Sequence, residues 1–382
     1  MEEYLSIQQA KRLVGQSVNT TYTDILYFKY FLELTHIDSL NLAYNKESNE
    51  RQITIAMDTE TSPYLNSLQS DGFVIVPSLL TPPEISTLRE AATKATTLTR
   101  AGQWPYFRTV PKQFPPWPKD VPPASEGGIW GVQHLLHPDM PGRGDFATLY
   151  FSEKVLGIVE ELLGLKSVSK EEKAEEEEPL VMELFNLLVA PEQKDFELRW
   201  HRDDIPSTVS AEEELRLLKS KSPQGRQSHA QYNLALCPDT SLIVIPGSHR
   251  RIRTETERNA DPYEAYLPGQ LTVKLEPGDA VFYDSNILHR GVYKPKPEGA
   301  EETRLTLHGS VGLKESSSTT DGDDKAADRA KVRATAVLQH SVGMWIDRDD
   351  ADLSYISERA ERMRRNLIAM GRGEDVGYSL EG

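Results

Sequence analysis

Residues 231–249 read QYNLALCPDTSLIVIPGSH. This stretch contains two short apolar runs, 231–236 and 242–245, whose length and content of aromatic and β-branched residues are typical of strands. The Pro-Gly pair that follows the second run favours a turn. Similar runs lie on both sides of this stretch, at residues 181–190, 271–275, 280–283, 305–311 and 334–345. Many short strands joined by tight turns predict an antiparallel β-sandwich or barrel.

Helical patterns flank these strands. Residues 72–76 have the character of a buried strand, and Thr81 then begins a helical pattern with Pro82 at its first position and Glu84 three residues after the cap. Further helices are expected at residues 152–163 and 350–370, where apolar side chains recur on one helical face. The sequence therefore predicts a mainly β fold with flanking helices.

Changes of composition divide the chain. The first part shows no clean hydrophobic period, whereas the charge run at 170–178 and the stretch rich in Ser, Thr, Asp and Gly at 316–328 are typical of solvated surface insertions. The expected division is, in chain order, an N-terminal extension at 1–62, a β domain at 63–349 with insertions near 167–178 and 313–332, and a C-terminal helix and tail at 350–382.

Composition and charge exclude several classes of protein. With 38% hydrophobic and 27% charged residues, the chain has the composition of a globular protein. Its formal net charge of −16 opposes binding to nucleic-acid phosphates or anionic lipid headgroups. Cys237 is the only cysteine, which excludes an intrachain disulfide and suits a reducing compartment. Because no run approaches about 18 apolar residues, we expect a cytoplasmic protein without membrane insertion.

A His-X-Asp triplet carries the candidate chemistry. In an extended segment, residues i and i+2 point to the same side, so His201 and Asp203 can reach one metal ion. His289, shortly after the strand run at 280–283, can supply a third ligand. Two histidines and one carboxylate leave positions open for a co-substrate and O2, as non-haem Fe(II) oxygenases require. A second such triplet at residues 36–38 lies in the unpatterned extension, where a surface or capping role is the simpler interpretation.

The order of several elements resembles a known family. The matching pieces are the strand and helix from Asp71, Trp200-His201-Arg202-Asp203, the Ile-Pro-Gly-Ser-His sequence that ends at His249, Pro277-Gly278-Asp279, and His289 followed by Arg304. Over about residues 68–312 the chain looks like the phytanoyl-CoA dioxygenase-like oxygenases. The resemblance implies a double-stranded β-helix that holds Fe(II) in its mouth and uses 2-oxoglutarate and O2 to oxidise a substrate.

The same resemblance indicates which residues bind 2-oxoglutarate. Its far carboxylate needs a cation, and the planar guanidinium of Arg304 suits it. Family members often place Ser two residues after the distal histidine and sometimes a basic residue before a Val-Gln pair, whereas this chain has Gly291 and Gly131 there. Other polar groups must therefore contribute, and Asn233 is our candidate.

The leading interpretation is an Fe(II)- and 2-oxoglutarate-dependent dioxygenase that hydroxylates, or otherwise oxidises, a small organic or lipid-like metabolite. One alternative is a non-catalytic β-helix protein with a binding or regulatory role. A second is a cupin-like metalloenzyme that does not use 2-oxoglutarate, and Arg304 distinguishes that case. The sequence does not identify the substrate or the oligomeric state.

Overall fold

The computed structural model describes residues 41–45, 50–54, 63–165, 178–221, 227–296, 303–314 and 324–371. The chain divides into two compact units, Met1–Thr61 and Ser62–Gly382. In the first unit, strands β1 (Asn41–Asn45) and β2 (Glu50–Thr54) pair antiparallel. The second triplet, at residues 36–38, lies outside the described residues.

The larger unit is built on a seven-stranded sheet with the strand order β3-β11-β8-β13-β6-β5-β4. Every neighbouring pair in it is antiparallel. Its strands are β3 (Phe73–Val76), β4 (Phe107–Thr109), β5 (Ile129–Val132), β6 (Leu180–Val189), β8 (His229–Ala235), β11 (Ala280–Tyr283) and β13 (Leu305–Leu313).

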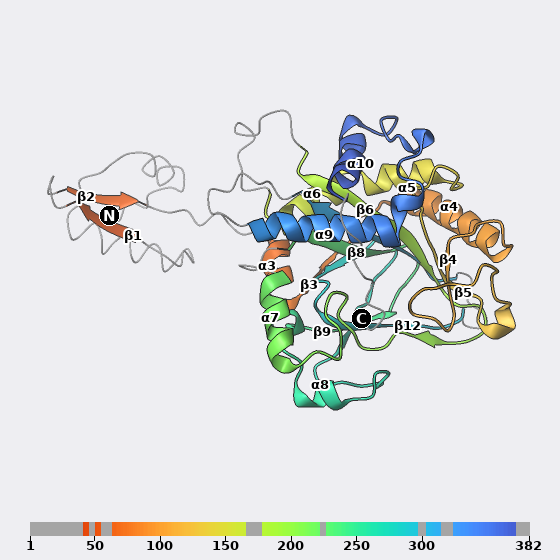
Figure 1. Cartoon of the computed structure of the whole chain (residues 1–382), viewed down its shortest axis with the longest axis horizontal. Coiled ribbons are helices and arrows are strands. Elements are labelled where there is room, and N and C mark those ends of the chain that lie inside the picture. Colours follow the sequence, from red (N-terminus) through yellow and green to blue (C-terminus); the bar gives the residue numbers. More distant parts are fainter. Residues whose placement is uncertain are drawn as a thin grey trace, which may run out of the picture. The chain divides into compact units, whose positions relative to one another are not determined.

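A second sheet of four strands, in the order β10-β9-β12-β7, is also antiparallel. Its strands are β7 (Phe196–Glu197), β9 (Leu242–Ile245), β10 (Leu271–Thr272) and β12 (Leu288–Tyr293). Two antiparallel sheets with flanking helices confirm the expected double-stranded β-helix. In Figure 1, β9 and β12 lie on one side of the seven-stranded sheet and several helices lie on the other.

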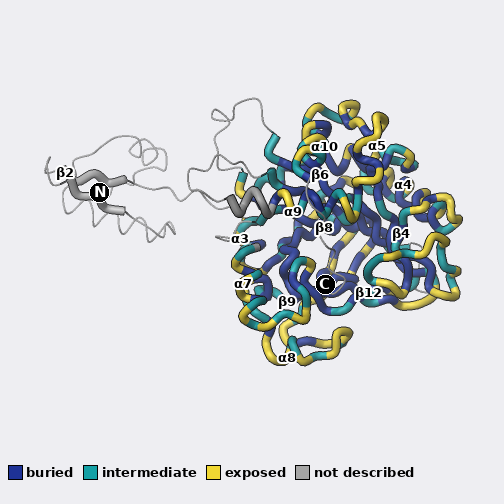
Figure 2. Tube along the Cα trace, viewed as in Figure 1, coloured by how far each residue is buried: buried dark blue, intermediate teal, exposed yellow. Residues whose placement is uncertain are grey.

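Helices cover the outer face of the seven-stranded sheet, where α4, α9 and α10 contact β5, β6 and β13. The main hydrophobic core lies between these layers and includes Phe185, Tyr232 and Phe282 from the strands and Ala92 from α4 (Figure 2). The helices are α3 (Pro63–Asp71), α4 (Pro82–Arg100), α5 (Arg143–Tyr150), α6 (Glu153–Leu162), α7 (Ala211–Lys221), α8 (Glu255–Asn259), α9 (Asp324–His340) and α10 (Glu358–Met370).

The helices predicted after Thr81 and near residues 152–163 and 350–370 correspond to α4, α6 and α10. The capping box of Thr81 and Glu84 is formed as predicted. The predicted strand at 334–345 is wrong, because this segment belongs to α9 and a following 3-10 turn. Ala330, Ala334 and Val337 are buried at spacings of four and three, which is a helical period. Helix α9 also begins inside the stretch assigned to the second insertion.

The inner face of the seven-stranded sheet carries polar side chains. The register places Asn233 of β8 opposite His308 of β13, and His308 opposite Asn186 of β6. Paired residues in a sheet point to the same side, so these three side chains share the face opposite the helix-packed one. Within the described part of the chain, no helix combines the length and apolar character that a bilayer crossing requires.

Candidate metal centre

His201, Asp203 and His289 come together at the mouth between the two sheets. One ligand atom from each lies within 4.8 Å of the others. His201 and His289 form an isolated antiparallel bridge, in which each backbone N–H donates to the other's carbonyl at 3.0 Å. Their rings are 4.3 Å apart, and the Asp203 Oδ1 atom lies 3.4 Å and 3.6 Å from the two Nε2 atoms.

Backbone carbonyls orient both imidazoles. The Nδ1 atom of His201 lies 2.7 Å from the carbonyl oxygen of Arg199, and the Nδ1 atom of His289 lies 2.9 Å from that of Ile287. Because a carbonyl oxygen only accepts, Nδ1 carries the proton in each ring and Nε2 keeps its lone pair. Both Nε2 lone pairs therefore face Asp203, which is the tautomer that a metal site needs.

The electrostatics of the cluster suit a cation. Burial lowers the pKa of His289 to about 4, with a further contribution from His201, so its ring is neutral at neutral pH. Burial opposes ionisation of Asp203, but the neighbouring His289 and His201 rings and a hydrogen bond from Gln231 lower its pKa overall. The Gln231 amide donates to Asp203 Oδ2 at 2.9 Å. The Asp203 side chain remains 35% exposed, so the carboxylate opens to solvent on its remaining side.

These three residues fit a mononuclear Fe(II) site. Two imidazole Nε2 atoms and one carboxylate oxygen on the same side of the protein form the 2-His-1-carboxylate set that leaves coordination positions free. The donor atoms come from two chain segments that are hydrogen-bonded to each other, and their orientations are fixed without the metal.

Arg202 points to the opposite side of the same segment and is fully buried. Its Nε donates to Glu214 of α7 at 2.9 Å, and its other nitrogens donate to the carbonyls of Ser248, Arg251 and Asn286. Arg253 and Arg258 also donate to the Glu214 carboxylate, at 3.0 Å and 2.5 Å. This network, which we call the Arg202 network, joins the ligand segment to α7 and to two loops.

Arg304 lies at the start of β13, on the same face as Thr306 and His308. It donates to Asp239 at 3.3 Å and to the carbonyl of Val189 at 3.1 Å. Its Nε is buried and has no hydrogen-bond partner among the described residues, so one donor is available for a ligand. Its guanidinium carbon lies 4.6 Å from the ring centre of Tyr293.

Asn233 lies two residues from Gln231 on the same strand face, and its Oδ1 is 2.9 Å from the Nδ1 of His308. Burial lowers the pKa of His308 to about 4, so this ring is neutral and its Nδ1 donates to the amide oxygen. The Asn233 amide oxygen therefore has one partner already, and its amide nitrogen is the group that can donate to a carboxylate ligand.

Sequence reasoning missed three residues of this face: Gln231, Tyr293 and Arg108. Gln231 is detectable from strand alternation, because it is two residues before Asn233. Arg108 of β4 lies opposite Gly131 of β5, and its Cδ is 3.2 Å from the place where a Cβ of residue 131 would lie. The cationic side chain of Arg108, on the neighbouring strand, thus lies next to residue 131.

Trp200, His249 and Arg290 have structural contacts away from the triad. Trp200 packs with Leu288 in a small core cluster, and the Nε2 of His249 is 3.1 Å from the carbonyl of Gln69. Arg290 points away from the metal face and donates to the carbonyl of Glu264.

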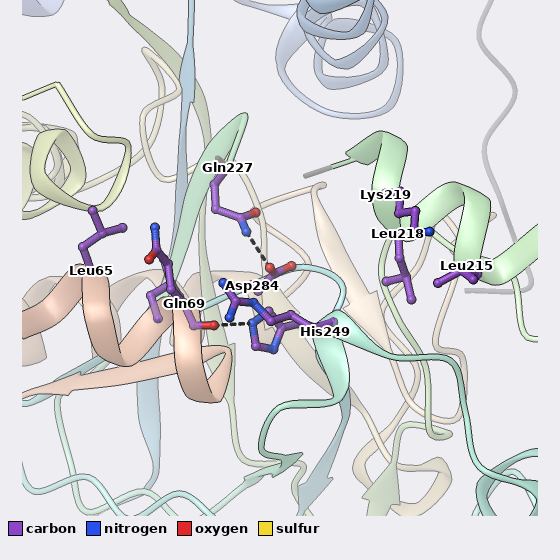
Figure 3. Close-up of a pocket in the computed structure, with 10 residues that line it drawn as sticks. Leu65, Gln69, Leu215, Leu218, Lys219, Gln227, His249 and Asp284 are labelled. Atoms are coloured by element: carbon purple, nitrogen blue, oxygen red, sulfur yellow. Dashed lines mark hydrogen bonds between the residues drawn. The ribbon is translucent and has the colours of Figure 1, made fainter. Parts of the chain in front are cut away.

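A separate pocket of about 190 Å³ lies between α3, α7 and the loop after β11 (Figure 3). None of the metal-centre triad lines it. In Figure 3 Asp284, which accepts from Gln227 at 2.5 Å, lies in the middle of the pocket, between leucines of α3 on one flank and leucines of α7 on the other. Because Asp284 begins the loop whose Ser285 carbonyl accepts from the Asp203 N–H, this pocket lies behind the metal-ligand segment.

Comparison with solved structures gives distant matches. The structure of EctD from S. alaskensis with 2-oxoglutarate and 5-hydroxyectoine is 18% identical, with a TM-score of 0.44 and coverage of 65% of this chain and 75% of that chain. The epimerase SnoN from nogalamycin biosynthesis is 18% identical, with a TM-score of 0.41 and coverage of 66% and 80%. We found no match among curated proteins.

A family model decides the assignment. Residues 68–292, more than half of the chain, match the model of phytanoyl-CoA dioxygenase (PhyH). This segment contains all three residues of the triad. The match favours an oxygenase over the non-catalytic and the 2-oxoglutarate-independent alternatives. The chain belongs to the phytanoyl-CoA dioxygenase family and is an iron- and 2-oxoglutarate-dependent dioxygenase.

Proposed function

We propose that His201, Asp203 and His289 bind the Fe(II), that Arg304 binds the far carboxylate of 2-oxoglutarate, and that the enzyme hydroxylates or otherwise oxidises a small organic molecule. The convergence of two oriented imidazoles on one partly exposed carboxylate carries this proposal. When bound, iron and 2-oxoglutarate together supply the oxidising power for attack on an unactivated C–H bond.

The protein's own residues hold the reacting groups. Gln231 keeps Asp203 Oδ2 occupied, so that Oδ1 faces the two histidines. The carbonyls behind His201 and His289 prevent the rings from turning. Arg304 adds a buried, unsatisfied Nε for a carboxylate, and the amide nitrogen of Asn233 supports it as a neutral donor.

The inner face of the sheet also favours a polar substrate over a long acyl chain. Asn233, His308 and Asn186 lie in one cross-strand row and are mostly buried or half-buried. Buried polar side chains are best satisfied by a ligand with hydrogen-bonding groups of its own.

Anaerobic titration tests the metal and co-substrate assignment. Metal-free protein receives Fe(II) and then 2-oxoglutarate while the visible metal-to-ligand charge-transfer band is recorded. We expect the band in the wild type and its loss in His201→Ala. A folded wild-type protein that gives no band would contradict the proposed site.

Arg304→Ala separates the co-substrate residue from the metal ligands. Loss of a charge-assisted pair should raise the Kd of 2-oxoglutarate by roughly 10- to 100-fold, because hydrogen bonds to charged groups contribute about 1.5–3 kcal/mol. Fe(II) affinity should be unchanged. Unchanged 2-oxoglutarate affinity and turnover would show that Arg304 does not bind the carboxylate.

A further inference from the structure

Gly291 lies two residues after His289 in β12, so a side chain at this position would point to the metal side of the strand. The space is already filled by Tyr293. A Cβ added at residue 291 would lie 2.5 Å from the hydroxyl oxygen of Tyr293 and 2.6 Å from its ring carbon Cζ. The phenol therefore leans back along the strand towards His289, and only glycine at residue 291 allows this.

The ring of Tyr293 is held firmly. It stacks on Trp130, with 5.5 Å between ring centres and 25° between planes, and on Phe196 at 6.2 Å and 20°. The guanidinium carbon of Arg304 lies over the ring, 4.6 Å from its centre. This packing holds the ring in one orientation, against the Arg304 guanidinium, whose Nε has no partner among the described residues.

The phenol is a hydrogen-bond donor at working pH. Burial raises the pKa of Tyr293 to about 12, although Arg304 acts in the opposite direction. A protonated hydroxyl and an arginine at one place suit an anion with two acceptor oxygens, because each oxygen can take a different donor.

We propose that the Tyr293 hydroxyl donates to the far carboxylate of 2-oxoglutarate, next to Arg304, and replaces a hydroxyl that would otherwise stand on residue 291. This inference rests on the proposed function. Tyr293 then binds the co-substrate, although it lies two residues after position 291 in β12.

The test compares two 2-oxo acids with Fe(II)-loaded protein in the absence of O2. Tyr293→Phe removes one oxygen and keeps the stacked ring. The Kd of 2-oxoglutarate, from calorimetry or the charge-transfer band, should rise about tenfold or more, as expected for a lost hydrogen bond to a charged group. The Kd of 2-oxobutyrate, which lacks the far carboxylate, should stay within about twofold of the wild-type value, since it makes no such bond.

Tyr232→Phe is the matched control. The Tyr232 hydroxyl also lies 2.5 Å from the Cβ position of a glycine, Gly309, but Tyr232 is packed in the core beneath the helices. Its removal should leave both Kd values unchanged.

The second test moves the hydroxyl from residue 293 to residue 291. Tyr293→Val should weaken 2-oxoglutarate binding and also clear the space beside Gly291. Adding Gly291→Ser to that variant should restore most of the lost affinity. Wild-type affinity in Tyr293→Phe would overturn the inference, provided that the wild type itself binds 2-oxoglutarate; a wild type that does not bind it would overturn the proposed function instead.

Discussion

The two sides of the segment 201–203 are held in different ways. On the metal side, His201 and Asp203 contact a few neighbours, and the carboxylate is 35% exposed. On the other side, Arg202 is fully buried and its guanidinium donates to one carboxylate and three carbonyls. Arg202 therefore anchors the segment, while His201 and Asp203 remain available to bind a ligand. Fold stability and ligand binding can therefore depend on different residues within one stretch of three.

Glu214→Gln should produce the largest change, because it removes the charge that compensates Arg202, Arg253 and Arg258. Leaving buried cations without their counter-charge costs about 3–5 kcal/mol. Chemical denaturation of the metal-free protein measures this loss.

Glu213→Gln is the control for that prediction. Glu213 lies next to Glu214 on α7, but its side chain is 40% exposed and pairs with Arg216 one turn further along the helix. Its substitution should leave the unfolding free energy nearly unchanged, because ion pairs exposed to solvent contribute little to stability. If Glu214→Gln and Glu213→Gln destabilise the protein equally, the buried side of the segment 201–203 does not have the anchoring role described above.

Asp203→Ala should weaken metal binding without a large loss of stability, in contrast to Glu214→Gln. Fe(II) affinity should fall about 100-fold or more, since even residues that only orient metal ligands contribute 10- to 100-fold. The unfolding free energy of the metal-free protein should change little, because the carboxylate is partly solvated. Metal titration and denaturation of the same sample check both statements, and a large loss of stability would break the comparison.

Asp284→Asn should change the stability by an amount that depends on pH. Burial raises the pKa of Asp284 from 3.8 to about 6, so the folded protein holds this proton more tightly than the unfolded chain. Its contribution is therefore most favourable below about pH 4 and is lost as pH rises to about 6. The Asn variant should be more stable than the wild type at pH 7.5, by on the order of 3 kcal/mol, and equal to it near pH 4. The same difference at both pH values would contradict this assignment.

Local patterns in the sequence were sufficient for part of this molecule. Strand alternation predicts that His201 and Asp203 point to one side, and the capping box marks the start of α4. The segment 334–345 was misassigned because its apolar residues fit a strand pattern over a short window, whereas contacts with β6 and β13 favour the helix. Tertiary packing overrides local preference in such segments.

Contacts between distant residues could not be predicted in this way. The bidentate pair between Glu183 of β6 and Arg333 of α9 joins residues 150 positions apart. The relation of Tyr293 to Gly291 depends on the ring leaning along its own strand, which no spacing rule specifies. The family resemblance implies a hydroxyl at residue 291 that this chain lacks, and the fold shows that the Tyr293 ring occupies the space beside Gly291.

The position of β13 in the sheet has a consequence for how the chain is made. This strand pairs with β6 on one side and with β8 on the other, although it is the last strand of the sheet in the sequence. During synthesis, the facing edges of β6 and β8 therefore remain open until residues 305–313 have emerged. Open strand edges invite pairing with other chains, and long-range strand pairing is slow. The interval before β13 inserts is thus the stage at which a nascent chain of this enzyme most needs protection from aggregation.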